Sequence, residues 1–190
     1  MGKLITSLKK IPTIAACGLD CGLCPRFYTN GPSRCPGCGG PDFLNKHPSC
    51  SFITCCVKKK NHEVCGECSE FPCAKFKTEE EYKNMTGSSS YPPPRNMIPN
   101  LTFIKNNGIQ KFVDQQRVRI NLLKTMIAQF DDGRSRSYFC RVSALLDTKI
   151  IQDSIDQAIL KIKTENIQPR DMKRKAKIIR SMLDEYLLDC

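Results

Sequence analysis

The stretch from Cys17 to Gly39, CGLDCGLCPRFYTNGPSRCPGCG, places five cysteines within 23 residues. Two of its intervals have the form Cys-x2-Cys, at Cys21/Cys24 and at Cys35/Cys38. This spacing lets two thiolates on one tight turn reach a single tetrahedral metal ion. Two such pairs close together make a complete set of four sulfur ligands. The stretch therefore predicts a module organised by bound metal.

Further cysteines continue this pattern as far as residue 73. Cys65, Cys68 and Cys73 supply three ligands for a second ion, and a fourth can come from Cys50 or from the adjacent pair Cys55 and Cys56. Adjacent residues rarely serve one ion equally well, so one member of that pair can bind metal while the other packs or remains a free thiol. Cys17 can likewise replace Cys21. The sequence thus predicts about two zinc ions, with ligands drawn from Cys17, Cys21, Cys24, Cys35, Cys38, Cys50, Cys56, Cys65, Cys68 and Cys73.

The turn Cys35-Pro36-Gly37-Cys38-Gly39 is the most specific of these elements. It points two sulfurs and the nearby backbone amides toward one ion, and glycine permits the positive backbone torsion that such a turn needs.

Cysteines at this density indicate either disulfides in an oxidising compartment or metal ligands in a reducing one. The amino terminus favours the second alternative. Lys9 and Lys10 are followed by only a short apolar segment, residues 11–16, which contains a proline and is shorter than the roughly 7–15 apolar residues of a signal peptide. No apolar run reaches the roughly 18 residues needed to span a bilayer. We therefore expect a soluble, cytoplasmic protein.

An iron–sulfur redox or sensor protein is the alternative, because cysteine thiolates also hold such clusters. Cys17-x3-Cys21-x2-Cys24 has the spacing of the cluster triplet of radical-SAM enzymes, but no large α/β barrel follows it. A cysteine nucleophile activated by His62 has no identifiable third residue to orient it. With thiolates so abundant, His47 and His62 are expected to be exposed loop residues. The sequence favours a protein that is not an enzyme and predicts no catalytic residue.

The chain is basic, with 30 Lys and Arg against 19 Asp and Glu, a formal net charge of +11. Two zinc ions, each held by four thiolates, would lower that charge to about +7. Most of the excess lies in residues 91–190, so an acidic partner, either a protein or a nucleic acid, would meet that half first.

Composition divides the chain into three parts: a cysteine-rich metal-binding module (1–85), a Ser/Pro-rich linker (86–100) and an α-helical bundle (101–190). The linker contains Gly87-Ser88-Ser89-Ser90-Tyr91-Pro92-Pro93-Pro94, which neither a helix nor a central strand tolerates. The fold class expected is α+β, mostly α. The module should consist of turns, short strands and short helices, including one near residues 79–82.

Apolar residues at helical spacing predict the elements of the bundle. A long amphipathic helix should run from about Ile109 to Phe130 and end at Asp131-Asp132-Gly133. A second should follow at residues 138–146, and a third should begin after a cap at Asp147 or Thr148. The last should begin near Pro169, with its buried side formed by Met172, Ala176, Ile179, Met182, Leu183, Tyr186 and Leu187.

Three parts of the sequence together resemble a family of small cysteine-rich prokaryotic proteins, the domain-of-unknown-function family 3795: CGLDCGLCP at 17–25, RCPGC at 34–38, and Cys65-x2-Cys68 with Phe71-Pro72-Cys73. The resemblance covers residues 17–73, and the stretch from 101 to 135 is similar to a helical extension in one branch of that family. The resemblance implies a cytoplasmic prokaryotic protein that binds metal, zinc being the expected ion, and it implies no established activity.

Overall fold

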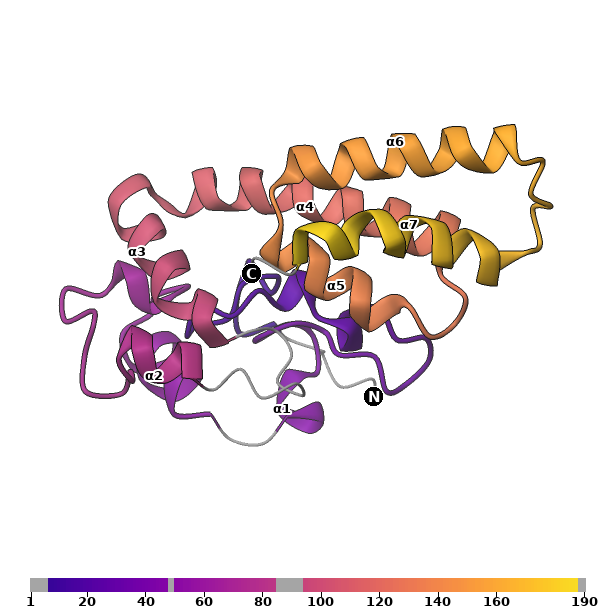
Figure 1. Cartoon of the computed structure of the whole chain (residues 1–190). Coiled ribbons are helices and arrows are strands. Elements are labelled where there is room, and N and C mark those ends of the chain that lie inside the picture. Colours follow the sequence, from indigo (N-terminus) through magenta and orange to yellow (C-terminus); the bar gives the residue numbers. More distant parts are fainter. Residues whose placement is uncertain (1–6, 48–49, 85–93, 188–190) are drawn as a thin grey trace. The chain divides into compact units, whose positions relative to one another are not determined.

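The computed structural model describes residues 7–47, 50–84 and 94–187 (Figure 1). The chain forms two compact units, Met1–Asp114 and Gln115–Cys190. The described residues form helices and turns but no β-strand. The mostly helical class is thus confirmed, whereas the short strands expected in the cysteine-rich module are wrong. The chain there turns often at Cys, Gly and Pro, and its backbone groups bond within turns or singly to distant segments, without the ladder of a sheet.

The first unit is built from short helical segments joined by irregular chain. Its 3-10 turns are η1 (Cys21–Leu23), η2 (Pro25–Tyr28), η4 (Cys65–Glu67) and η5 (Pro94–Asn96), and η3 (Ile53–Lys59) is a π-helix. Its α-helices are α1 (Phe43–Lys46), α2 (Glu79–Asn84) and α3 (Met97–Asn107), followed by the first residues of α4 (Ile109–Phe130). The short helix expected near 79–82 is α2. The segment 86–93 of the expected linker lies outside the described residues.

Helix α3 docks directly on the cysteine-rich chain. The Nδ2 of Asn100 donates to the Gly18 carbonyl (2.9 Å) and to the buried carboxylate of Asp20 (3.0 Å). On another side of α3, a Cβ added at Gly66 of η4 would lie 2.6 Å from the Leu101 carbonyl oxygen. Only glycine permits so close an approach of the two backbones. Residues 97–107, which the sequence did not predict as a separate helix, are therefore part of the first unit.

A hydrophobic core holds the first unit together, although its regular elements are short. Its members come from the irregular chain as well as from the helices: Ile14, Phe43, Ile53, Val64, Phe71, Leu101 and Ile104 are all buried. Rings add to it, with Phe76 meeting Phe71 edge to face at 5.3 Å between centroids. Cys17, Cys38 and Cys56 belong to this core, and Cys21, Cys50 and Cys65 pack against it.

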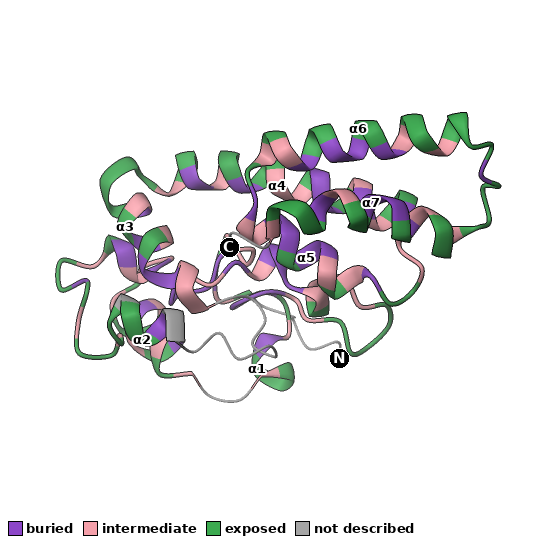
Figure 2. Cartoon of the chain, in the orientation of Figure 1, coloured by how far each residue is buried: buried purple, intermediate pink, exposed green. Residues whose placement is uncertain are grey.

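The second unit contains the rest of α4 together with α5 (Arg136–Leu145), α6 (Thr148–Thr164) and α7 (Met172–Leu187). Helices α6 and α7 run antiparallel side by side, and Figure 2 shows their buried stripes (purple) between exposed faces. Arg119 of α4 donates to the carbonyls of Ser143 (2.9 Å) and Leu146 (2.6 Å), the orphan acceptors at the end of α5.

The helices expected from the periodicity of residues 109–187 are confirmed in type and order. α4 ends at Phe130, and the side chain of Asp147 caps α6 by accepting a hydrogen bond from the Lys149 amide (2.7 Å). The last helix begins at Met172, a little later than expected, and Tyr186 is 45% exposed where a buried position was expected. None of the described helices combines the length and the apolar character needed to cross a membrane.

Candidate metal centre

The cysteines of the first unit form two groups. We call Cys17, Cys21, Cys24, Cys35, Cys38 and Cys50 the first thiol cluster, because their sulfurs act electrostatically on one another. The second thiol cluster lines one enclosed cavity of about 30 Å³ and consists of Cys55, Cys56, Cys65, Cys68 and Cys73. Every predicted ligand therefore falls in one cluster or the other. The structure adds Cys55, which the predicted set left out. Cys17 also acts on Cys65 of the second cluster, so the two groups adjoin.

Each cluster contains one Cys-Gly-x-Cys turn, and the two turns have nearly the same backbone conformation. In η1 the Cys24 amide donates to the Cys21 carbonyl (3.2 Å), and in η4 the Cys68 amide donates to the Cys65 carbonyl (3.0 Å). Cys24 ends its turn at φ −86° and ψ 134°, and Cys68 ends its turn at φ −82° and ψ 135°. Two segments separated by some forty residues of sequence thus present their paired sulfurs from the same local geometry.

The third Cys-x2-Cys pair is held from outside its own turn. The Cys38 amide donates to the Pro12 carbonyl (2.9 Å), which fixes the turn against the chain that precedes the first cluster. Gly39, directly after Cys38, adopts φ +69°, so the positive torsion expected for a glycine of this turn is confirmed.

Burial dominates the acidity of the first cluster. It raises the pKa of the Cys17 thiol to about 12, and the Cys38 and Cys50 sulfurs add to the rise, while the Leu19 amide opposes it. Burial, followed by the charges of neighbouring cysteines, also raises the pKa of Cys21. Such thiols keep their protons at neutral pH. A metal ion that binds them must displace those protons, which makes binding stronger as pH rises.

The second cluster contains a direct thiol pair. A hydrogen bond between Cys56 and Cys65 lowers the pKa of Cys56 and raises that of Cys65. Cys56 thereby becomes the thiol of this pair that ionises first, and its side chain is buried on the π-helix η3, with only 2% of the residue exposed. At the cavity edge, Lys60 Nζ lies 3.2 Å from Cys68 Sγ and 2.6 Å from Glu70 Oε1.

The wide turn of the π-helix allows the side chains of two adjacent cysteines to line the same cavity. Cys55 and Cys56 both line the enclosed cavity, and Cys55 also lines an open hollow of about 540 Å³, which it shares with Cys50 of the first cluster. Single π-turns often occur at functional sites. Lys59 and Lys75 line the same hollow, so its wall is cationic as well as thiol-bearing.

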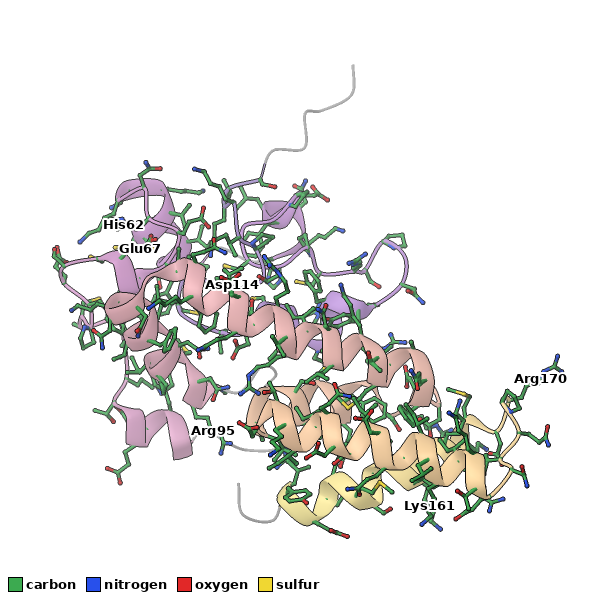
Figure 3. The ribbon with its side chains drawn as sticks, turned by 90° about the horizontal axis from the view of Figure 1, so that it is seen from above. His62, Glu67, Arg95, Asp114, Lys161 and Arg170 are labelled. Carbon is green, nitrogen blue, oxygen red and sulfur yellow. The ribbon has the colours of Figure 1, made fainter. Side chains whose placement is uncertain are left out.

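His47 is more closely involved than an exposed loop residue would be. Its Nε2 lies 3.3 Å from Cys35 Sγ, and its ring stacks on Phe43 at 4.6 Å between centroids. Burial, with the charge of Arg26, lowers the pKa of His47 and favours the neutral ring. The helical spacing Phe43-x3-His47 was a signal for this pairing. His62 is half-buried, next to the second cluster, in the part of the unit that Figure 3 marks with its label.

Lys9 is a charged residue that the structure buries, which its sequence context did not indicate. Only 4% of it is exposed, and its Nζ donates to the Ile14 carbonyl (2.6 Å). Its charge acts on one thiol of each cluster, lowering the pKa of Cys38 against the larger effect of burial and contributing to the lowered pKa of Cys56.

The donors fit a thiophilic ion in chemistry, though they are not arranged as a finished coordination shell. All of the described cysteines have free thiols. Across residues 7–47, 50–84 and 94–187, no three His, Cys, Asp or Glu side chains lie close enough together to form a metal site as they stand. Sulfur-only donors on tight turns suit zinc or an iron–sulfur cluster.

A family model described as protein of unknown function (DUF3795) matches residues 13–78. The cysteine-rich module carries the DUF3795 sequence pattern. The matched segment includes every cysteine of both clusters, so the resemblance stated from the motifs is confirmed. Searches of the curated proteins and of the solved structures found no match.

Proposed function

We propose that the DUF3795 module of this chain binds about two zinc ions, one at each thiol cluster, and that the protein is a cytoplasmic binding or adaptor protein with no catalytic site. The observation that carries this proposal is the repetition of one turn geometry at Cys21/Cys24 and Cys65/Cys68, each beside further thiols. The first ion would take Cys21, Cys24, Cys35 and Cys38, with Cys17 and Cys50 in reserve. The second would take Cys56, Cys65, Cys68 and Cys73.

The metal would act as a structural cross-link. Regular elements in the first unit are short, and tetrahedral zinc held by four thiolates joins segments that hydrogen bonds alone join weakly. Backbone amides would also stabilise the thiolates. The amide of Leu19 donates toward the sulfur of Cys17, and the amides of Arg26 and Phe27 donate toward that of Cys24, which favours the charged forms of both side chains.

Elemental analysis of protein purified without oxygen tests the metal proposal. We expect a colourless protein that holds about two equivalents of zinc. Visible absorption with stoichiometric iron and acid-labile sulfide would identify the iron–sulfur alternative instead. Full retention of the native circular dichroism after exhaustive chelation, with no metal released, would overturn both.

The helical unit supports the adaptor role because α7 carries a basic exposed face opposite its buried one. Ala176, Ile179 and Leu183 are buried, and the exposed side contains Lys173, Arg174, Lys177 and Arg180. Arg174 is partly engaged with Glu165 (2.8 Å), and the Arg180 guanidinium lies over the Tyr138 ring at 4.6 Å. Figure 3 shows Arg170 on the loop before α7 and Lys161 on α6. Such a face suits an acidic protein or nucleic acid.

A binding assay with single-stranded RNA and duplex DNA at low and moderate salt distinguishes these partners. If a nucleic acid is the partner, affinity should fall steeply with salt, and Lys173→Glu combined with Lys177→Glu should abolish binding. Lys149→Glu, an exposed change at the start of α6, is the matched control. Absence of binding to both nucleic acids at low salt would leave an acidic protein as the proposed partner.

A further inference from the structure

The buried Lys9, which acts on a sulfur of each thiol cluster, is held by a specific fit. The amides of Leu8 and Lys9 both donate to the Gly39 carbonyl (2.7 and 3.1 Å), which ties this segment to the residue after Cys38. The side-chain stem of Lys9 lies against Gly39 so closely that an added Cβ there would sit 2.8 Å from Lys9 Cγ. Gly39 is therefore needed both for its positive torsion and for the space that Lys9 occupies.

An ammonium in such a place is costly without an anionic partner. The ammonium donates to the Ile14 carbonyl, and within the described part of the chain no carboxylate pairs with it. Burying an unpaired charge carries a large desolvation cost. The groups on which Lys9 acts electrostatically are instead sulfurs, Cys38 in the first cluster and Cys56 in the second.

We propose that Lys9 is a buried counter-charge shared by the two thiol clusters, and that it sets how tightly both of them hold metal. The inference rests on the proposed zinc binding. A zinc ion with four thiolates carries a formal charge of −2, so each loaded site would be an anion inside the protein. A fixed cation that acts on a sulfur of each site stabilises both anions, because charges interact more strongly in the protein interior than in water.

Lys9 is on this view a positioning residue and not a ligand. It makes no bond to the metal and acts through the charge of the sulfurs. Residues that support metal ligands in this way typically contribute about 10- to 100-fold to metal affinity. The effect should appear at both sites, since Lys9 acts on one member of each cluster.

Zinc competition with a chromophoric chelator, on the full chain at fixed pH and salt, tests this inference. Lys9→Met removes the charge and keeps the length of the side chain, and Lys9→Gln removes the charge but keeps a hydrogen-bond donor. We expect both variants to lose about 10- to 100-fold in zinc affinity at each site. Lys58→Met, which removes an exposed charge from the π-helix beside the second cluster, should leave both affinities unchanged.

A second control separates charge from packing. Ile14→Val trims a fully buried side chain next to the Lys9 hydrogen bond without altering any charge, and its loss of affinity should be smaller than that of either Lys9 variant. An equal loss in Ile14→Val, or unchanged affinity in the Lys9 variants, would overturn the counter-charge role and leave the zinc proposal standing. If the unmodified protein takes up no zinc, both proposals fail.

Discussion

The ammonium of Lys60 lies 3.2 Å from the sulfur of Cys68, at the edge of the cavity that the second thiol cluster surrounds. Glu70 and then Cys68 hold the pKa of Lys60 above its ordinary value, so this side chain is a cation throughout the neutral range. A donor of this kind stabilises a thiolate by a charge-assisted hydrogen bond. Lys60 thus stabilises thiolate charge from the protein surface, as we propose that Lys9 does from the interior.

Lys60→Met should weaken zinc binding at the second cluster alone, by a few-fold, and leave the first unchanged. The loss should be smaller than for Lys9→Met, because the Lys60 side chain is 30% exposed and solvent screens its charge. Site-resolved zinc competition measures both effects. An equal loss at the two sites would contradict the local role of Lys60.

Cys56→Ser and Cys55→Ser form a matched pair on neighbouring residues of the π-helix. We expect Cys56→Ser to lower the zinc content by about one equivalent, because Cys56 is the buried thiol bonded to Cys65. Cys55→Ser should retain both equivalents, because Cys55 also faces the open hollow. Zinc content by elemental analysis decides between them, and the opposite ranking would assign Cys55 as the ligand.

Raising the pH above 9 should destabilise the metal-free protein. The folded Cys17 thiol has a pKa of about 12 against an ordinary value of 9.0, so the folded state binds this proton more tightly than the unfolded state does. Its contribution to stability is full below pH 9 and is lost as the pH rises from 9 toward 12. Thermal unfolding of the metal-free protein at pH 7.5 and at about pH 10.5 measures the difference. An unchanged melting temperature at the higher pH would contradict this assignment.

Gly66→Ala should destabilise the first unit by about 1–3 kcal/mol, because the added methyl meets the α3 backbone at Leu101 instead of a movable side chain. Urea unfolding, followed by circular dichroism, measures the loss. Ser69→Ala, an exposed change just after the same turn, is the control and should be nearly neutral. A neutral Gly66→Ala would show that α3 does not lie this close to η4.

The helices after residue 108 could be predicted because each buries one stripe at regular spacing, and the Asp147 cap marks where α6 begins. Helix α3 was not predicted because Pro99 and several polar residues interrupt its apolar pattern. Its docking depends on the hydrogen bond from Asn100 to Asp20, a contact between distant parts of the chain that sequence spacing does not reveal. The domain limits read from composition, 1–85, 86–100 and 101–190, remain a prediction. The contact-based division at Asp114 follows packing instead.

The candidate ligands could be found from cysteine spacing alone, because each Cys-x2-Cys pair is a local property of one turn. Their grouping depends on tertiary contacts, as when Cys50 comes near enough to Cys17 and Cys38 to act on their sulfurs. The burial of Lys9 carries no local signal at all. It depends on Gly39, thirty residues later, leaving room for its side chain.

Cys140, expected from its apolar stripe to be a small buried side chain, is 0% exposed inside the helical unit and belongs to neither thiol cluster. A sulfur so enclosed reacts with an alkylating reagent only while its surroundings have opened. The alkylation rate of the peptide that contains Cys140, measured by mass spectrometry, therefore reports how often the helical unit opens locally. Cys140 is therefore a built-in probe of local unfolding in the helical unit, separate from the cysteines of the two thiol clusters.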